Sequence, residues 1–312
     1  MNLVFIVNEK SGNGNGAKIW AKLAQELTIP YELMKTTYEK QAVEYAAQLA
    51  ATVTQPTLVV GIGGDGTYHE ILNGLNGATQ ILVGAVCAGS GNDFKRAYYE
   101  FESAAHIEQF LKNPQSLKKD LGTIETANAP IYFVNNSGIG FDATVAITAN
   151  ESKVKDTFNK WKLGKLSYVY YLIKCLFTFK PFDLTVSQNG VEKHYSRVWF
   201  VTASNQPFFG GGMNISPTSN TEDELLELTV VHNLNKYKLL FIFGTVFFGK
   251  HTGFKEIDQL QAKSFSIRMK ESYLMHADGE KLPIDTANGE IVFTVAEQKW
   301  QLANMNDEKR HS

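Results

Sequence analysis

The sequence predicts an α/β domain with a parallel sheet, followed by an all-β, sandwich-like domain with added helices. Strand-like and helix-like patterns alternate over residues 1–125, which is typical of a parallel sheet wound in one hand. Over residues 126–303 the pattern changes to mostly consecutive strands. The length of 312 residues suffices for two ordinary cores. Residues 304–312 form a polar tail.

The first domain is predicted element by element from its periodicity. In the first helix, for example, Ile19, Leu23 and Leu27 share one face. The predicted strands are Leu3–Val7, Tyr31–Lys35, Thr57–Val60 and Ile81–Ala85, and the predicted helices are Ala17–Leu27, Glu39–Ala51 and Thr67–Leu75. Polar or glycine-rich loops follow three of these strands. Parallel sheets bind ligands beyond the carboxyl ends of their strands, so we expect a ligand there.

The second domain is predicted as an antiparallel sheet or sandwich, because several strands alternate with period two. The predicted strands are Ile131–Asn135, Phe182–Gln188, Tyr195–Ala203, Leu225–His232, Ser264–Met269 and Glu290–Val295. The predicted helices are Ala143–Asn150, Lys165–Phe179 and Lys236–Phe248.

Composition excludes several classes of protein. The net charge of -2 gives no general attraction to nucleic acid. Cys87 and Cys175 are too few for a disulfide framework or a cysteine-based metal site, which fits a reducing cytoplasm. Residues 1–7 lack the features of a signal peptide, and no apolar run reaches transmembrane length. We therefore expect a cytoplasmic protein.

The loop after the third strand is the first candidate site. A strand that ends in glycines and opens a helix leaves backbone N–H groups suited to phosphate. Asp65 inside this loop would repel phosphate unless it meets a cation or its bound water. Gly61, Gly63 and Gly66 match a dinucleotide pattern, but the loop follows the wrong strand and lacks an acidic residue about 20 positions on. The segment Gly12–Gly16 begins five residues past its strand, too late for the tight turn, and Glu32 lies at the start of the next strand rather than at its end. A Walker A motif is absent.

Five ordered motifs carry a resemblance to a known family. They are Gly63–Thr67 with Glu70 and Asn73-Gly74, then Gly89–Arg96, Asn135–Ala143, Gly210–Pro217 and Asp278–Glu280. Together they resemble the diacylglycerol kinase catalytic-domain family, which includes bacterial diacylglycerol and lipid kinases and the sphingosine and ceramide kinases. The first motif is shared with the more distant NAD kinases and phosphofructokinases. The resemblance covers nearly the whole chain and is less specific for the substrate.

The resemblance implies that ATP binds in the first domain and the acceptor lipid in the second. The ATP-binding residues carried over are Asn8, Thr37, Gly63, Gly64, Asp65, Gly66, Thr67, Tyr68, His69, Ser90 and Asn92. Glu9 and Cys87 stand where the family usually has proline, and Ser90 where it has threonine. Two of these residues have other interpretations, because Asn92 with Asp93 and Thr37 could be ordinary helix caps.

The resemblance also implies a magnesium ion away from the phosphates, held by the Asp223 carboxylate and the main-chain carbonyls of Asn220 and Leu225. A hard cation that keeps several waters suits such sparse oxygen ligands. Glu224 stands where the family usually has glycine, so it could strain the turn or add a ligand. The alternative is an acidic surface loop.

The last motif gives the catalytic hypothesis. Phosphoryl transfer needs a base beside the acceptor hydroxyl, and a carboxylate can accept its proton. By resemblance Glu280 is that base, Asp278 supports it or the metal, and Asp65 organises metal and water. A plain hairpin turn at 277–280 is the alternative interpretation. His69 and His276 are other candidate bases.

The acceptor side contains two basic and aromatic segments. Lys153–Lys165 is rich in lysine and tryptophan and leads into an aromatic helix, a pattern typical of contact with an anionic membrane. Lys236-Tyr237-Lys238 before Leu239–Phe248 repeats it, although both apolar faces could instead pack on the core. We therefore expect a lipid partner at a membrane surface and peripheral membrane association. The oligomeric state is left open, a homodimer included.

The expected function is that of an ATP- and Mg²⁺-dependent lipid kinase, with diacylglycerol as the expected acceptor and phosphatidic acid as product. Two alternatives are a soluble-substrate kinase such as an NAD kinase, and a non-catalytic nucleotide- or lipid-binding regulator on the same fold. The sequence does not name the lipid.

Overall fold

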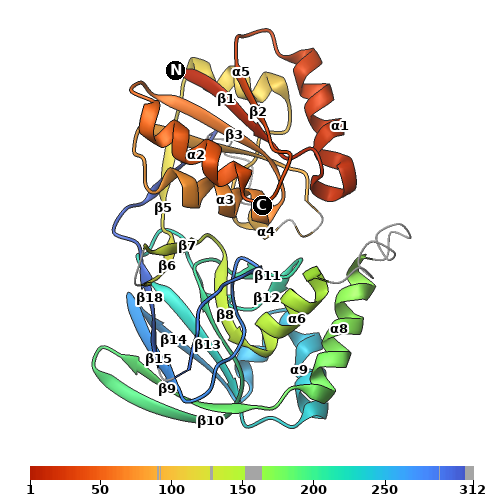
Figure 1. Ribbon diagram of the computed structural model, residues 1–312, viewed down its shortest axis with the longest axis vertical. Helices are drawn as coiled ribbons and strands as arrows, with labels where there is room; N and C mark the ends of the chain where they lie inside the picture. The colour runs from red at the N-terminus through yellow and green to blue at the C-terminus, as the bar shows by residue number, and fades with distance from the viewer. Residues whose placement is uncertain (90, 92, 127–128, 152–163, 288, 306–312) are drawn as a thin grey trace. The chain divides into compact units, whose positions relative to one another are not determined.

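The computed structural model describes residues 1–89, 91, 93–126, 129–151, 164–287 and 289–305. The chain forms two compact units (Figure 1). The first comprises Met1–Leu121 and the segment that begins at Glu297, and the second comprises Gly122–Ala296. The first is an α/β unit and the second an antiparallel β sandwich with helices, which confirms the predicted fold class.

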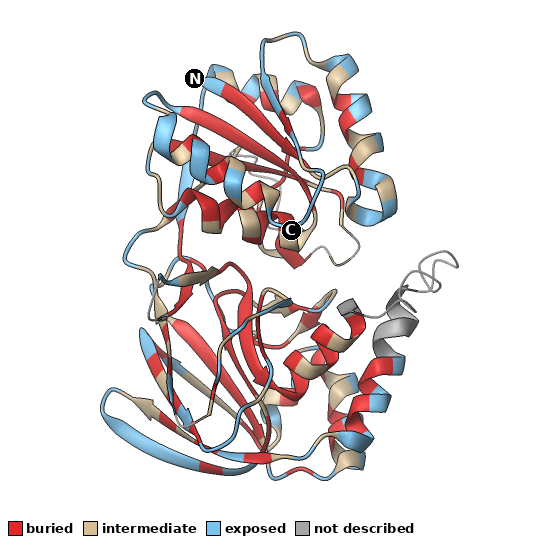
Figure 2. Cartoon of the chain, in the orientation of Figure 1, coloured by how far each residue is buried: buried red, intermediate tan, exposed pale blue. Residues whose placement is uncertain are grey.

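The first unit is built on a sheet that has six strands within the described residues, in the order β2-β1-β3-β4-β19-β5. All neighbours are parallel except β19 and β5. Its elements are β1 (Asn2–Val7), α1 (Ser11–Glu26), β2 (Glu32–Lys35), α2 (Gln41–Thr52), β3 (Thr57–Gly63), α3 (Asp65–Leu75), β4 (Ile81–Cys87), α4 (Asp93–Ala97), α5 (Ala104–Lys112), β5 (Ser116–Lys119) and β19 (Trp300–Ala303). Every residue of β3 is buried, as expected for a central parallel strand (Figure 2).

The strand β19 differs from the predicted domain division. Residues 300–303 were assigned to the second domain, but they pair with β4 and β5 in the first sheet. Trp300 is buried there and lies against the rings of Phe94 and Tyr98. A strand of four residues has too short a pattern to indicate which sheet it joins.

The second unit contains an antiparallel sheet that includes eleven strands among the described residues. Its strands are β6 (Gly122–Ile124), β7 (Ile131–Phe133), β8 (Asn136–Gly140), β9 (Phe182–Gln188), β10 (Val191–Ser204), β13 (Leu226–His232), β14 (Ile257–Ala262), β15 (Ser264–Met269), β16 (Met275–Ala277), β17 (Glu280–Lys281) and β18 (Glu290–Val295). A short pair, β11 (Phe208–Phe209) and β12 (Met213–Asn214), lies apart from it. The helical elements are α6 (Phe141–Glu151), α8 (Gly164–Thr178), α9 (Lys236–Val246) and the 3-10 helix η1 (Lys250–Gly253).

The apolar core of the second unit includes two large clusters. One fills the sandwich and includes the fully buried rings of Phe133, Phe265 and Phe293. The other lies where α6, α8 and α9 cover the sheet, and includes Phe141 and Trp199 (Figures 1 and 2). None of the helices in the described residues is long and apolar enough to cross a membrane.

Candidate functional site

In the first unit, the loops that follow β1, β3 and β4 meet at backbone level. A Cβ at Gly12 would lie 1.9 Å from the carbonyl oxygen of Ala88, and Gly12 has a φ of 58° that favours glycine. A Cβ at Gly89 would lie 2.7 Å from the Cα of Gly64. Glycine is therefore required for the loops to approach, and the predicted Gly63–Gly64 segment lies at the centre of this contact.

Asp65 begins α3 and joins two of these loops. Its Oδ1 accepts a hydrogen bond of 2.8 Å from the backbone N–H of Phe94, at the start of α4. A Cβ at Gly91 would lie 2.8 Å from the other carboxylate oxygen. The carboxylate thus holds the second glycine loop in place, which is a role that the sequence did not indicate.

Tyr68 and His69 lie in the first turns of α3, directly after the glycine loop, and both are buried. The Tyr68 hydroxyl donates to the carbonyl of Gly61 and accepts from the N–H of Val86, each at 3.0 Å. Burial raises the pKa of this hydroxyl well above its ordinary value. The Tyr68 side chain therefore supports β3 and β4 from inside the unit.

A polar cavity of about 270 Å³ lies beside the loop, between the ends of β1 and β2 and the start of α3. Asn8 and Thr67 line it and are joined by a hydrogen bond of 3.3 Å. Lys10 also lines it and donates from Nζ to the carbonyl of Thr37 at 3.0 Å. The cavity brings together three predicted ATP-binding residues, and Lys10 adds a cation that the sequence did not single out. Ser90 and Asn92 lie outside the described residues.

Glu70 and Thr37 shape the rim of this cavity. The Glu70 carboxylate accepts from the N–H groups of Lys40 and Ala42 at 3.1 and 3.2 Å, and so caps the start of α2. The N–H and hydroxyl of Thr37 both donate to Gln41 Oε1, at 2.6 and 3.1 Å. The N-cap of α2 is Lys40, so Thr37 does not cap this helix, and its side chain lines the cavity.

In the second unit, the Asp278 carboxylate is an acceptor for three backbone N–H groups. Val134 donates at 2.8 Å to one oxygen, and Asn135 and Asn136 donate at 2.8 and 3.2 Å to the other. These bonds interrupt the predicted strand 131–135, which ends at Phe133 before β8 begins. Asp278 therefore anchors the turn to the sheet.

The turn presents Glu280 on its exposed side. Glu280 opens the short strand β17 and is exposed. His276, in contrast, is fully buried, stacks on Phe209 with ring centroids 5.0 Å apart, and accepts a 3.1 Å hydrogen bond at Nδ1 from the N–H of Gly279. Of the candidate bases in this unit, Glu280 is the accessible one.

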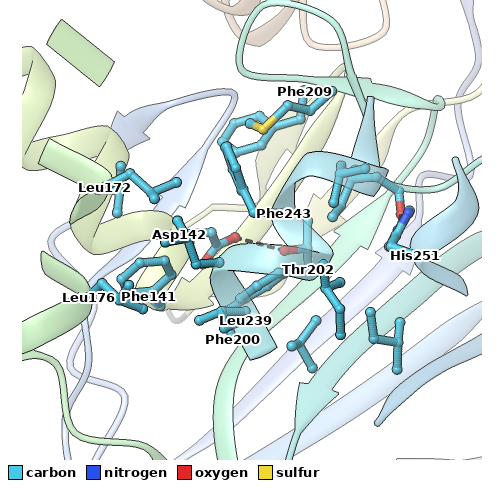
Figure 3. A pocket seen from close by; sticks show the side chains of 18 residues that line it. Phe141, Asp142, Leu172, Leu176, Phe200, Thr202, Phe209, Leu239, Phe243 and His251 are labelled. Atoms are coloured by element: carbon cyan, nitrogen blue, oxygen red, sulfur yellow. Dashed lines mark hydrogen bonds between the residues drawn. The ribbon is translucent and has the colours of Figure 1, made fainter. Parts of the chain in front are cut away.

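An apolar cavity of about 50 Å³ lies among α6, α8, α9 and the sheet (Figure 3). Its polar lining includes Asp142, Thr202 and His251. The Thr202 hydroxyl donates to Asp142 Oδ2 at 2.7 Å, and His276 Nε2 lies 3.5 Å from the same oxygen. The rest of its lining is apolar. Asp142 belongs to the motif Asn135–Ala143, but its contacts with Thr202 and His276 become apparent only in the folded structure.

The predicted magnesium loop contains a second carboxylate. Gln261 Nε2 donates to Asp223 Oδ2 at 3.4 Å and to Glu227 Oε1 at 2.9 Å. Glu227 is buried, its other oxygen has no hydrogen-bond partner, and burial raises the pKa of its carboxyl. Three or more histidine, cysteine or acidic residues do not gather at any point of the described residues. A cation here would therefore rely on two carboxylates, main-chain carbonyls and water, which fits Mg²⁺.

Glu224 explains why glycine is usual at its position. Its φ is 61°, a left-handed conformation that non-glycine residues adopt at a cost. Its carboxylate pairs with Lys263 at 3.2 Å. Glu224 thus strains the turn, and its charge is directed to a lysine.

Each of the two units matches a known protein family. Residues 2–124 match the diacylglycerol kinase catalytic domain, and residues 136–294 match the YegS C-terminal NAD kinase beta sandwich-like domain. The chain belongs to the diacylglycerol kinase catalytic-domain family. Membership confirms the resemblance and makes the protein an enzyme of the lipid kinase class.

Individual relatives agree with this assignment. The chain is 32% identical to the Bacillus subtilis (strain 168) protein named "Putative lipid kinase YtlR", over 88% of this chain and 92% of the relative. It is 30% identical to a Mycobacterium tuberculosis (strain CDC 1551 / Oshkosh) diacylglycerol kinase, over 74% and 73%. A solved structure of a "putative diacylglycerol kinase" from Bacillus anthracis str. Sterne has a TM-score of 0.73 at 20% identity, over 98% and 95%, and supports the fold.

Proposed function

We propose that the protein transfers the γ-phosphoryl group of ATP to the hydroxyl of a diacylglycerol, giving a phosphatidic acid and ADP. The observation that carries the acceptor is the apolar cavity lined by α6, α8 and α9, in the same unit as Glu280. Its lining of Leu, Ile, Val and Phe side chains offers an alkyl chain a dry environment. The names of the relatives favour diacylglycerol as the acceptor.

The polar cavity and glycine loops of the first unit support ATP as the donor. The start of α3 offers backbone N–H groups and the positive end of a helix dipole to phosphate. Asn8, Thr37 and Thr67 offer hydrogen-bonding groups at the cavity, and Lys10 offers a charge. We assign the ATP contacts predicted at Gly63–Thr67, Ser90 and Asn92 to this function. The buried side chains of Tyr68 and His69 support the loop from inside the unit.

In the proposed reaction, Glu280 accepts the proton of the acceptor hydroxyl as its oxygen forms a bond to the γ-phosphorus. The bond between that phosphorus and the bridging oxygen breaks, and ADP leaves with the electron pair. Asp278 positions Glu280 through its three backbone bonds. Asp65 holds the glycine loops where the phosphates bind.

We assign Mg²⁺ two roles in this function. Mg²⁺ bound with ATP supplies neutralising charge at the phosphates. A second ion would be held by the Asp223 carboxylate and the carbonyls of Asn220 and Leu225, with the unpartnered oxygen of Glu227 beside them. There it would link the loop to β13 and stabilise the unit.

The proposed acceptor is a membrane lipid, so we place the enzyme at the cytoplasmic surface of a membrane, as a peripheral protein. Its expected partner is therefore the lipid at that surface, and the protein has no need of nucleic acid.

The test is ATP consumption by the purified protein with diacylglycerol micelles, with NAD and without acceptor. We expect turnover with diacylglycerol and formation of phosphatidic acid. Turnover with NAD alone would replace the proposal by a soluble-substrate kinase. ATP binding without turnover on a panel of lipids would indicate a regulator.

Glu280→Gln tests the base. The variant should bind ATP with an unchanged Kd and lose at least a hundredfold in kcat, because general-base catalysis contributes about 10²–10⁴-fold. The folding stability should be unchanged, because Glu280 is exposed. A kcat equal to that of the wild type would remove Glu280 from this role.

A further inference from the structure

The helix α9 exposes large apolar side chains on one face while it packs with the other. Leu239, Ile242 and Val246 are buried against the unit. The exposed side chains include Tyr237, Phe241 and Phe248, which are 80%, 67% and 75% exposed, together with Leu240 and Phe247. A helix that is apolar on all sides is expected to be buried, and α9 is not buried.

The neighbouring helix α8 extends this apolar surface. Tyr170, Ile173 and Phe177 of α8 are exposed. The two helices meet where Lys236 Nζ donates to the carbonyl of Phe177 at 3.0 Å and lies 5.6 Å from the centre of its ring. In Figure 1 both helices lie on the same side of the second unit. We name this set the α8–α9 surface, and it consists of Tyr170, Ile173, Phe177, Tyr237, Leu240, Phe241, Phe247 and Phe248.

The charges around the α8–α9 surface are almost all positive. Residues 170–180 and 236–256 contain the lysines Lys174, Lys180, Lys236, Lys238, Lys250 and Lys255. The one carboxylate in these ranges, Glu256, is buried and paired with Lys238 at 2.6 Å. The whole chain has a net charge of -2, so this positive charge is local.

We propose that the α8–α9 surface docks on an anionic lipid bilayer, with its aromatic side chains in the interface and the lysines at the headgroups. The proposal rests on the proposed function, because the acceptor is a lipid. The buried face of α9 also lines the apolar cavity, through Leu239, Ile242 and Val246. A lipid leaving the bilayer would thus pass a single helix to reach the cavity.

A bilayer fits this surface better than a second copy of the chain. In a symmetric dimer the same patch meets itself, so lysines would face lysines. Anionic headgroups instead complement them, and each lysine near such a surface contributes about 1 kcal/mol.

Vesicle flotation without ATP tests the docking surface. We expect the full-length protein to float with vesicles of phosphatidylglycerol and phosphatidylcholine, less with phosphatidylcholine alone, and less at high salt. The double variant Phe241→Ser with Phe248→Ser should lose binding by at least about tenfold, because both rings leave water on docking. Val191→Ser removes an apolar side chain that is 71% exposed elsewhere on the same unit, and should bind as the wild type does.

Further results separate docking on a bilayer from the alternatives. Unchanged flotation of the double variant, or no flotation of the wild type, would overturn it. Dissociation of a wild-type dimer by the same variant, seen in sedimentation, would assign the surface to a second copy and also overturn it. Docking in a protein that does not phosphorylate diacylglycerol would leave this proposal standing and defeat the proposed function alone. The variant should retain its activity on a monomeric short-chain diacylglycerol.

Discussion

Asp278 and Glu280 are two residues apart, yet their carboxylates have different surroundings. Asp278 is bound by three backbone N–H groups, and its φ of 50° places it in the left-handed region. Glu280 is exposed. The same turn thus contains one carboxylate that serves the fold and one that is accessible to a substrate.

Asp278→Asn is predicted to destabilise the protein by about 2 kcal/mol, because hydrogen bonds to a charged acceptor are stronger than those to a neutral one. Asparagine tolerates the left-handed conformation, so the loss reports the charge together with the one acceptor oxygen that the amide nitrogen replaces. Chemical denaturation measures it, with Glu280→Gln as the matched control that leaves stability unchanged. Equal stability of the two variants would contradict the anchoring role.

Glu227 gives a prediction for pH. Burial raises the pKa of its carboxyl above the ordinary value of 4.5, so the folded state binds the proton more tightly than the unfolded state. Its contribution to stability is therefore present below pH 4.5 and is lost as the pH rises through the raised pKa. Glu227→Gln in a chelator should be more stable than the wild type at pH 7, and no more stable below pH 4.5.

At pH 7, adding Mg²⁺ should make the wild type more stable than Glu227→Gln, which reverses the order expected in a chelator. A cation bound at Asp223 and Glu227 stabilises the folded wild type by mass action, and the glutamine variant should gain much less. Thermal unfolding with and without Mg²⁺ measures the difference. If both proteins gain equally, Glu227 does not contribute to the cation site.

At the scale of elements, the glycine loops show how tightly the ends of β1, β3 and β4 are fitted. Gly89→Ala would force a methyl group to 2.7 Å from the Cα of Gly64. We predict a stability loss of about 1–3 kcal/mol. We also expect a KM for ATP raised at least about tenfold, because small misplacements in positioning loops are costly.

Gly253→Ala is the control for this prediction, since a Cβ there meets nothing within 4 Å. The Gly253→Ala variant should leave the stability and the KM for ATP unchanged. Denaturation and steady-state kinetics measure the two effects. Wild-type kinetics in Gly89→Ala would show that the loops do not need this close approach.

The helices α8 and α9 were predicted close to their observed ranges, because apolar periodicity is a local property. Membrane contact was expected for the segment that leads into α8, but which side chains of the two helices are exposed was not predicted. For Leu239–Phe248, packing and membrane contact were both left open. The structure shows a packed face and an exposed one on the same helix. Residues 153–163 of the predicted basic segment lie outside the described residues.

At the scale of the whole molecule, the chain returns to its first unit at the end. The strand β19 lies between β4 and β5, and Trp300 Nε1 donates to the carbonyl of Asp120 at 3.3 Å. The first unit therefore depends on residues from both ends of the chain.

Truncation after Ala296 should consequently destabilise the first unit, because β4 and β5 lose their shared neighbour. Hydrogen exchange should show faster exchange in β4, and truncation after Met305 serves as the control that keeps β19. Equal protection of β4 in the two truncated proteins would mean that β19 is dispensable.

The sequence by itself determined the alternating elements of the first unit, the strands of the second and the family. These follow from hydrophobic periodicity and motif residues, which are local features of the sequence. Only the tertiary structure decided what the motif residues do. Asp278 meets Asn135 across 143 positions and Asp65 meets Phe94 across 29, so neither partner follows from spacing. The physical reason is that a carboxylate bonds the N–H groups that folding brings to it, and local sequence does not specify which these are.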